Sequence, residues 1–482
     1  MNTADTRTRH VVVIGGGISG LAAAHRLLEA GAWVTVLEAS GRVGGKLYAG
    51  EIAGMPVDLG AESMLARRPE AIDLARAVGL DGRLQAPVTT AAALWNRGAL
   101  TPMPAGHVMG VPGDPQALAS VLSPEGLERA GQDRVLEPTP VGDDVAIGAY
   151  VAERLGREVV DRLVEPLLGG VYAGDAYRIS MRAATPRLFE AVKAHDSLLD
   201  GVREVQEEAA AQQRTGPVFM GIEGGMGVLP GAVADAVRAR GGEILLDAPV
   251  SELTRTAEGW QVRTRDRVLT ADGVVLATPA RPASQLLAAA SPAASAELSE
   301  VEYASMALVT MAFRRRDLEG LPGFSGRSGF LVPPVDGRTI KASTFSTRKW
   351  AWNDAAAPDL FVLRTSIGRY GEEERLHDDD ADLVEVSLRD LGEAAGLAAK
   401  PVATEVTRWM GGLPQYPVGH LDRVARVREQ LAELPGLRVC GAAYDGVGIP
   451  ACVASGRRAA DEIVESLRTG TPAPGTNRGA GQ

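Results

Sequence analysis

Several common features are scarce in this sequence, and each scarcity excludes a class of protein. Only two cysteines, Cys440 and Cys452, occur among 482 residues. They are too few for a disulfide scaffold, and isolated thiols are typical of a reducing compartment. Neither their spacing nor the six histidines match a ligand pattern, so we predict no metal site. The net charge of −11 argues against general nucleic-acid binding, which needs a basic surface.

Long apolar runs are also missing. No run reaches the roughly 18–20 apolar residues of a membrane-spanning helix, and the segment VVVI near the start is too short for a signal sequence. We therefore expect a cytoplasmic protein, and a peripheral contact with a membrane is left open. With 482 residues, of which 57 are glycine and 29 are proline, the chain fits two or three domains with many turns.

A glycine cluster follows the first apolar run. The letters HVVVIGGGISG predict a buried parallel strand and then a GxGxxG motif on Gly15, Gly17 and Gly20. In this motif the first glycine permits a tight turn, the second lets a pyrophosphate approach the backbone, and the third lets the helix pack closely on the strand. The predicted helix 18–30 would direct its N-terminal amides at the phosphates.

Glu38 ends the next predicted strand, AWVTVLE. A carboxylate at this position can accept hydrogen bonds from both ribose hydroxyls of an adenosine, and it would repel the 2′-phosphate of NADP. Strand, motif, helix and acid together predict a dinucleotide site, and a glycine-rich structural turn is the alternative. NAD and FAD share these features, so the choice between them depends on the residues that follow.

A second glycine-rich segment, ASGRVGGKLYAG, begins directly after Glu38. It suits an extended ligand that runs deeper into the protein, and Arg42 or Lys46 could face the phosphates of that ligand. The segment GMPVDLGAES then adds another strand and turn. Because NAD dehydrogenases usually lack this second motif, the pattern favours FAD.

The whole chain predicts an α/β protein, α+β overall, with three domains. A discontinuous Rossmann-like FAD-binding domain would carry an inserted helical domain and a substrate-binding domain with a mixed sheet, because alternating β-branched and aromatic residues are frequent after residue 300. The predicted ranges are 10–79, 216–280 and 435–467 for the FAD-binding domain, 80–215 for the helical domain, 281–434 for the substrate-binding domain, and 1–9 and 469–482 for flexible tails.

Two further motifs stand near the C-terminus. One is a fixed spacing of polar and aromatic residues, RWMGGLPQYPVGH, that runs from Trp409 to His420. The other, LRVCGAAYDGVGIPACVASG, predicts a strand, a glycine turn and a helix. Amides at the start of that helix could hold the pyrimidine edge of an isoalloxazine, where negative charge collects on reduction.

With these motifs the chain resembles the flavin-dependent protoporphyrinogen and coproporphyrinogen oxidases of the soluble Gram-positive-bacterial type, within the flavin amine oxidase superfamily, over roughly residues 10–465. The resemblance implies an FAD- and oxygen-dependent enzyme of haem biosynthesis. Its reaction would be the six-electron oxidation of coproporphyrinogen III to coproporphyrin III, which releases three molecules of hydrogen peroxide. A transient contact with a haem-pathway chelatase is left open.

Other functions stay open at this point. They are a protoporphyrinogen IX oxidase, a flavin amine oxidase or carotenoid-type desaturase of the same fold, and a flavin-binding protein without turnover. An aromatic content of only 4% speaks mildly against an amine oxidase, because a bound amine would need an aromatic sandwich around the flavin.

The resemblance also implies a set of cofactor-binding residues. The glycine motif would hold the pyrophosphate, Glu38 the ribose, Val250 the adenine, and Trp409 would lie near the flavin. The full predicted set is Gly15, Gly16, Gly17, Ile18, Ser19, Gly20, Glu38, Ala39, Arg42, Gly45, Lys46, Gly60, Ala61, Glu62, Ser63, Val250, Trp409, Val447, Gly448 and Ile449.

The substrate of such an enzyme carries propionates, which are costly to bury without cations. The predicted cationic partners are Arg67, Arg68, Lys341 and Arg364. Some family members have a basic residue where this chain has Glu62, so the partner from that loop is open. A strong base is not required, because nitrogen lone pairs and solvent can assist, and no catalytic acid or base is assigned.

Overall fold

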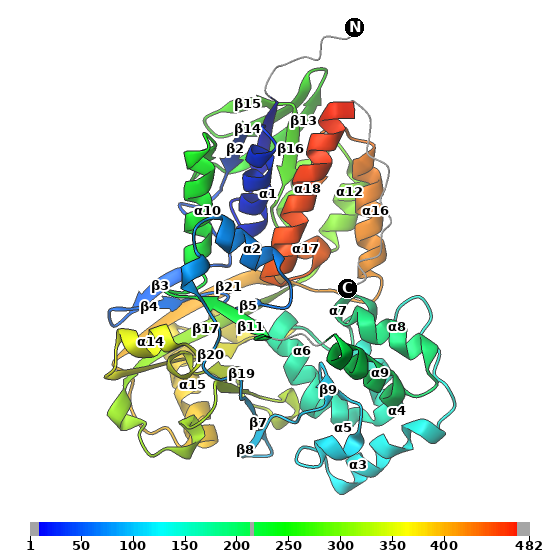
Figure 1. The fold of residues 1–482 in the computed structure, drawn as a ribbon, viewed down its shortest axis with the longest axis vertical. Helices are drawn as coiled ribbons and strands as arrows, with labels where there is room; N and C mark the ends of the chain where they lie inside the picture. The colour runs from blue at the N-terminus through cyan, green and yellow to red at the C-terminus, as the bar shows by residue number, and fades with distance from the viewer. Residues whose placement is uncertain (1–8, 213–215, 470–482) are drawn as a thin grey trace.

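The computed structural model describes residues 9–212 and 216–469. The predicted flexible tails, 1–9 and 469–482, lie outside this part except for Arg9 and Thr469. Figure 1 shows three regions: a parallel-sheet region at the top, a second sheet at the lower left, and a helical region at the lower right. The predicted mixed α/β fold class is confirmed.

The parallel-sheet region is built on a five-stranded sheet in the order β12-β2-β1-β16-β22, in which each neighbouring pair is parallel. β1 is buried along its whole length, which explains why its sequence lacks polar alternation. The strands come from widely separated parts of the chain: β1 (His10–Ile14), β2 (Trp33–Leu37), β12 (Glu243–Leu245), β16 (Gly273–Leu276) and β22 (Leu437–Val439).

Both faces of this sheet are covered. Val11 and Val13 of β1 pack into one core and Val12 and Ile14 into another, as expected for residues that alternate along a strand. The first face is covered by α1 (Ile18–Glu29), α2 (Glu70–Ala77), α10 (Val228–Ala239) and α18 (Ile449–Thr469). The second is covered by α11 (Ala280–Leu287), α12 (Pro292–Ser299), α16 (His420–Ala432), α17 (Ala442–Asp445), β13 (Val250–Thr256), β14 (Gly259–Thr264) and β15 (Val268–Ala271).

The predicted domain division and this packing differ within the segment 281–434. Leu287 of α11, Leu298 of α12 and Val427 of α16 share one apolar core with the parallel sheet. A parallel sheet needs apolar cover on both faces, and these helices provide it. We therefore propose that α11, α12 and α16 belong to the same domain as the parallel sheet.

The second sheet has the strand order β21-β17-β20-β19-β18-β7-β8 and is antiparallel except between β18 and β7. The helix α15 (Asp380–Ala395) packs on one face, where Leu391 and Phe361 share a core. Ala312 on the other face packs against the hairpin β3–β4. The strands are β7 (Ala93–Asn96), β8 (Ala99–Pro102), β17 (Tyr303–Arg314), β18 (Gly329–Leu331), β19 (Ile340–Thr344), β20 (Leu360–Ile367) and β21 (Ala403–Pro414), and α13 (Ser346–Lys349) and α14 (Ala351–Ala356) connect β19 to β20.

The helical region is formed by much of the segment 80–215. The hairpin β7–β8 of that segment belongs instead to the second sheet, because β7 pairs with β18 and extends that sheet. A π-helical turn, Val160–Val164, directly precedes α6. The helices are α3 (Pro124–Gly131), α4 (Ile147–Leu155), α5 (Arg157–Val159), α6 (Glu165–Tyr172), α7 (Met181–Ala184), α8 (Pro186–Ala194) and α9 (Leu198–Ala211).

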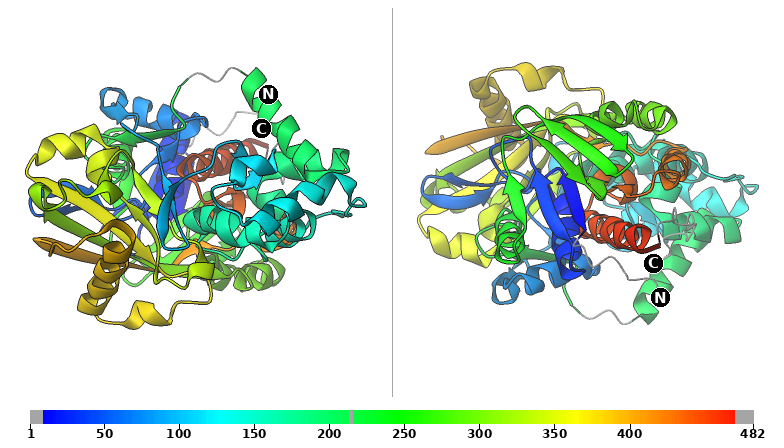
Figure 2. Two further views of the ribbon diagram at one scale, coloured as in Figure 1. Left: turned by 90° about the horizontal axis from the view of Figure 1, so that it is seen from below. Right: turned by 90° about the horizontal axis from the view of Figure 1, so that it is seen from above.

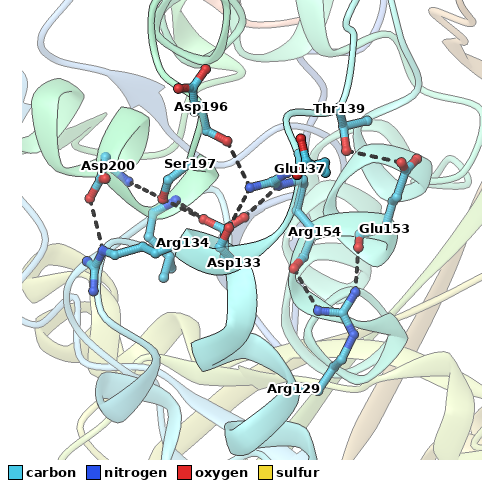
Figure 3. Close-up of polar contacts among 11 residues, drawn as sticks. Arg129, Asp133, Arg134, Glu137, Thr139, Glu153, Arg154, Asp196, Ser197 and Asp200 are labelled. Carbon is cyan, nitrogen blue, oxygen red and sulfur yellow. Dashed lines mark hydrogen bonds and ion pairs between the residues drawn. The ribbon is translucent and has the colours of Figure 1, made fainter.

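A buried ion pair holds the helical region together (Figure 3). The side chains of Arg154 and Asp133 are 1% and 0% exposed, and Arg154 Nε lies 2.6 Å from Asp133 Oδ1. The other guanidinium nitrogens donate to three backbone carbonyls, and Asp133 Oδ2 accepts from Ser197 Oγ and the amide of Leu199. These hydrogen bonds offset the cost of taking both charges out of water.

Short strands connect the three regions. β11 pairs with both β5 and β6, and β3 pairs with β4. Seen from below in Figure 2 (left), the second sheet and the helical region lie side by side. The connecting strands are β3 (Ala49–Ile52), β4 (Met55–Asp58), β5 (Met64–Leu65), β6 (Leu84–Gln85) and β11 (Phe219–Ile222). The strands β9 (His107–Val108) and β10 (Val111–Pro112) pair with each other and pack on α9 in the helical region.

Candidate functional site

The three glycines of the N-terminal motif have different surroundings. Gly15 has a φ of +111°, and a Cβ there would lie 2.7 Å from the carbonyl oxygen of Ala277. A Cβ at Gly20 would lie 1.9 Å from the carbonyl oxygen of Gly15. A Cβ at Gly17, by contrast, would meet no atom within 4 Å. The packing of the protein itself therefore requires Gly15 and Gly20, whereas Gly17 leaves room beside the start of α1, which begins at Ile18.

Glu38 is fixed at the end of β2. Its Oε2 accepts from the amide of Gly16 at 2.7 Å, and its Oε1 accepts from the amide and the hydroxyl of Ser40 at 2.9 and 2.7 Å. Its carbonyl accepts from the amide of Ala248, which brings the start of β13 at Val250 into the neighbourhood. Ala39 beside it is exposed. The predicted ribose and adenine contacts are thus on adjacent segments.

The second glycine segment lies against the first. The amide of Gly44 donates to the carbonyl of Gly16 at 2.8 Å, and a Cβ at Gly45 would lie 3.5 Å from the Cα of Gly17. Arg42 is held within this segment, because its Nη2 donates to the carbonyl of Gly45 and its guanidinium covers the ring of Tyr48 at 4.0 Å. The two predicted glycine loops form one surface.

Lys46 joins this surface to the turn after β4. Its carbonyl accepts from the amide of Ala61 at 3.1 Å, and a Cβ at Gly60 would lie 2.1 Å from the same oxygen. Burial lowers the pKa of the Lys46 amine, and Cys452 acts in the opposite direction. Only glycine can occupy position 60 without moving this backbone.

The C-terminal motif places a second helix start beside the first. α18 begins at Ile449 after the turn of Val447 and Gly448. It packs closely on α1, since a Cβ at Gly456 would lie 2.1 Å from the carbonyl oxygen of Ser19. Neither helix has an acidic residue in its first turn. Two helix N-termini of positive polarity therefore lie side by side, where negative groups of a ligand are stabilised.

Trp409 of β21 lies over the turn that follows β4. Its Nε1 donates to the carbonyl of Leu59 at 2.9 Å, and its ring edge is 3.3 Å from where a Cβ of Gly60 would be. The second sheet therefore reaches the glycine surface through an aromatic side chain, next to the residues predicted to line the flavin.

Glu62 and Arg364, which we predict to contact cofactor and substrate, are partners of each other. Arg364 Nη2 lies 2.9 Å from Glu62 Oε2, and Lys349 Nζ lies 3.6 Å away. Glu62 Oε1 accepts from Ser346 Oγ at 3.0 Å and Trp350 Nε1 at 2.9 Å. Sequence reasoning missed Ser346 and Trp350. Glu62 stands where some family members have a basic residue. This difference in the sequence indicated that a basic partner for Glu62 would come from another part of the chain.

The charge of Glu62 is strongly stabilised. Burial by itself would raise the pKa of this carboxyl, but Arg364, Lys349 and the hydrogen bonds from Trp350 and Ser346 outweigh burial and lower the pKa to about 2. Arg364 also donates to the carbonyls of Asp58 and Gly60 at 3.2 and 2.8 Å. Its guanidinium thus holds the turn that carries Gly60, Ala61, Glu62 and the partly exposed Ser63.

The other predicted cationic residues lie in different settings. Arg67 and Arg68 are exposed, and Arg68 pairs with Glu70 at 2.7 Å. Lys341 is 6% exposed, and its amine lies 4.0 Å from Met306 Sδ. In the part of the chain that the structure describes, Lys341 is in no ion pair. Among the four predicted cations, Lys341 thus combines burial with the lack of an ion-pair partner in the described ranges.

Residues 9–212 and 216–469 contain neither a metal-binding cluster nor a membrane-spanning helix. No group of three His, Cys, Asp or Glu side chains in these ranges could hold a metal ion. Nor does any helix in them have the length and apolar character needed to cross a membrane.

The sequence matches the family described as flavin containing amine oxidoreductase over residues 18–464. The chain belongs to this family. Family membership carries a flavin cofactor with it, which confirms that part of the prediction. The surface made by the two glycine loops, the turn at Gly60 and the start of α18 stays the predicted place for such a group.

Within this family, the chain is similar to proteins that are named porphyrinogen oxidases. The coproporphyrinogen III oxidase of Mycobacterium tuberculosis (strain ATCC 25618 / H37Rv) is 36% identical over 466 residues, which cover 95% of this chain and 98% of the relative. The protoporphyrinogen oxidase of Macaca fascicularis is 30% identical, with the same coverage. A solved structure of a provisionally named protoporphyrinogen oxidase from Exiguobacterium sp. 255-15 has a TM-score of 0.84 at 32% identity and covers 95% of this chain and 99% of that one. The predicted family is confirmed.

Proposed function

We propose that the protein catalyses the FAD-dependent oxidation of coproporphyrinogen III to coproporphyrin III in haem biosynthesis. The observation that carries the proposal is the 36% identity to a coproporphyrinogen III oxidase across 95% of this chain. Molecular oxygen would be the electron acceptor, and three molecules of hydrogen peroxide would be released. The proposal includes a cytoplasmic location. A transient contact with a haem-pathway chelatase stays a prediction to which no residue is assigned.

The residues at the glycine surface fit FAD. The backbone of Gly15–Gly20 and the start of α1 would hold the pyrophosphate, where Gly17 leaves space for it. Glu38 would accept from the ribose, and the turn Gly60–Ser63 with Trp409 would flank the ring system. The start of α18 would face the pyrimidine edge. When bound, the flavin supplies the two-electron oxidation of a substrate carbon–hydrogen bond.

The role of the protein is to bind and orient the porphyrinogen. The face of the second sheet that carries Trp409 and Met306 offers a surface beside the flavin turn, and α6 covers part of it, since Gly170 approaches Leu331. Lys341 would bind a carboxylate there. No side chain is assigned as a proton acceptor, because orientation can supply most of what the reaction needs from the protein.

Protoporphyrinogen IX is the second candidate substrate. The relative from Macaca fascicularis, at 30% identity, is the observation that favours it. The two substrates differ in charge, because coproporphyrinogen III carries four carboxylates and protoporphyrinogen IX carries two. A buried cation in the site therefore favours the first.

The test of function is a side-by-side aerobic assay of the FAD-loaded protein with both porphyrinogens, followed by porphyrin fluorescence. We expect a larger kcat/KM for coproporphyrinogen III. Preference for protoporphyrinogen IX would select the second candidate. If the flavin-bound protein formed no porphyrin from either substrate, the proposal of a porphyrinogen oxidase would be overturned and an amine oxidase would be favoured.

FAD binding has its own test in a matched pair of variants. Gly17→Ala and Gly231→Ala each place a methyl group where no atom lies within 4 Å, but only Gly17 lies at the proposed pyrophosphate site. We expect Gly17→Ala to lose FAD on dialysis while Gly231→Ala, on the exposed side of α10, keeps it. Equal retention of FAD would contradict the proposed site.

A further inference from the structure

Lys341 occupies an irregular position in the second sheet. β19 pairs with β20 through Ile340 opposite Ile367 and Ala342 opposite Ser366, and the register shifts between these two pairs. Lys341 is therefore the extra residue of a β-bulge. Bulges redirect side chains and are frequent next to active sites.

The contact that Lys341 makes defines the face on which its amine lies. Nζ is 4.0 Å from Met306 Sδ, and Met306 is directly opposite Trp409 in the antiparallel pair β17–β21. Directly opposite residues share a face of the sheet, and Trp409 bonds to Leu59 beside the flavin turn. The amine thus lies on the face that carries the candidate site, whereas Ile340 packs in the core beneath α15.

Within residues 9–212 and 216–469, no acidic side chain forms an ion pair with Lys341. Arg369 donates to the carbonyl of Ile340, which precedes Lys341, and to that of Val332, whose amide donates to the carbonyl of Lys341. On the α15 side, Asp390 accepts from the amides of Thr339 and Ile340 and so stabilises the backbone.

Glu165, at the start of α6, interacts electrostatically with Arg369. Its carboxyl accepts from the amide of Ala176 at 2.6 Å. Burial, and to a smaller extent the nearby Asp175, raises the pKa of this carboxyl to about 7. Among the described residues, Glu165 and Lys341 form no ion pair. A buried ammonium without a carboxylate partner is costly, so Lys341 is held in a setting that an incoming carboxylate would improve.

We propose that Lys341 is the receptor for one carboxylate of the porphyrinogen and takes up a proton from solvent when that carboxylate binds. This inference rests on the proposed function, since it names the substrate group that the site recognises. The amine gains one proton, the resulting ammonium pairs with the carboxylate, and no bond of the substrate changes. Burial and then Arg369 lower the pKa of the amine to about 7, so this uptake falls in the neutral range.

The chemistry of the substrates turns this receptor into a source of selectivity. Coproporphyrinogen III carries one propionate on each of its four pyrroles, so every orientation of the ring can present a carboxylate to Lys341. Protoporphyrinogen IX has vinyl groups on two pyrroles, so half of its orientations would leave the amine facing an apolar group. Lys341 can therefore pair with a carboxylate in every orientation of the tetracarboxylate, but in only some orientations of protoporphyrinogen IX.

The experiment measures equilibrium binding of the product coproporphyrin III between pH 6 and 9 and kcat/KM for both porphyrinogens. Lys341→Met should weaken coproporphyrin III binding at least tenfold at pH 6.5. It should lower kcat/KM for coproporphyrinogen III more than for protoporphyrinogen IX. In the unsubstituted protein, affinity should fall up to tenfold per pH unit above about pH 7, because an uncharged amine must first be protonated. Lys341→Arg should bind tightly without this pH dependence.

Two controls make the outcome specific. Lys400→Met removes an exposed amine and should change nothing, and Glu165→Gln should keep the pH dependence. Equal behaviour of Lys341→Met and Lys400→Met, or failure of Lys341→Arg to restore affinity in protein that retains flavin, would overturn the inference. If the unsubstituted protein neither oxidised a porphyrinogen nor bound coproporphyrin III, the proposed function itself would fail instead.

Discussion

The helical region and the turn beside the candidate site each bury an arginine–carboxylate pair. In the helical region, Arg154 and Asp133 find their partners within one stretch of the chain that ends at Leu199. Beside the site, Glu62 is bonded to Trp350 and Ser346, which lie 288 and 284 residues further along. The first pair is local to its region, and the second joins the parallel-sheet region to the second sheet.

The two pairs also differ in what they hold. The carboxylate oxygens of Asp133 accept hydrogen bonds from the guanidinium of Arg154, the hydroxyl of Ser197 and the amide of Leu199. This network includes none of the residues assigned to the flavin. Glu62 and Arg364 hold the turn at Gly60, which we assign to the flavin. A buried ion pair can thus serve mainly stability in one region and mainly position in another, and substitutions can separate these roles.

The largest effect is expected for Arg154→Met. Removal of the arginine leaves the buried Asp133 without its counter-charge, which costs about 3–5 kcal/mol of unfolding free energy. Flavin content and activity per folded molecule should stay unchanged. Denaturant unfolding with flavin absorbance and specific activity measures both.

Arg187→Met provides the control for this prediction in the same region. Arg187 pairs with Glu208 at the surface, where removal should cost less than about 1 kcal/mol. A similar cost for both substitutions, or a loss of flavin in Arg154→Met at temperatures where it is folded, would contradict the proposed separation of roles.

A smaller loss of stability but a larger functional effect is expected for Glu62→Gln. The pKa of Glu62 is lowered from 4.5 to about 2, which corresponds to about 3 kcal/mol of stability at neutral pH. The amide can keep a hydrogen bond, and Arg364 keeps its two carbonyl acceptors, so the cost should stay below that of Arg154→Met. Because the turn at Gly60 loses an anchor, FAD affinity and kcat should also fall.

Flavin release on dilution and single-turnover kinetics check the functional part of this prediction. Glu302→Gln, which removes a half-exposed partner of Arg178, is the matched control and should behave as the unsubstituted protein. Unchanged FAD affinity in Glu62→Gln would mean that both buried pairs serve stability alone.

The same carboxyl predicts a pH dependence. Since its pKa is lower in the folded state than the ordinary value of 4.5, its contribution is complete above about pH 4.5 and is lost as the pH falls toward 2. The difference in unfolding free energy between the unsubstituted protein and Glu62→Gln should therefore shrink below pH 4.5. Denaturant curves at pH 3 to 7 measure it, and a constant difference over that range would refute the assignment.

The contrast between the pairs also explains how much the sequence could predict. The predicted glycine loops and Glu38 are linked by contacts between residues close in sequence, such as Gly16 with Glu38 and Gly44 with Gly16, so their spacing alone suggested them. The family resemblance extended the predicted site to Trp409 and the start of α18. The ion pair of Glu62 could not be predicted, because its partners depend on how β20 and α13 pack against a turn that lies far away in sequence.

Irregular strand pairing could not be predicted from the sequence either. A mixed sheet was predicted in the segment that holds Lys341, but the bulge at Lys341 is a feature of the register with β20, and a sequence pattern does not report register. The hairpin β7–β8 was placed in a helical segment, because its pairing partner β18 is more than 200 residues away. The Arg154–Asp133 pair left no signal in composition or periodicity.

The smallest effect is expected for Lys349→Met, which tests how the charge of Glu62 is shared between its two cations. Lys349 Nζ is 3.6 Å from Glu62 Oε2, against 2.9 Å for Arg364 Nη2, so Lys349 contributes mainly by Coulomb attraction. We expect a loss of about 1 kcal/mol or less and an acid-unfolding midpoint at slightly higher pH. Arg348→Met, on the exposed side of the same short helix, is the control. A loss as large as that in Glu62→Gln would mean that Lys349 carries most of the charge stabilisation at this turn.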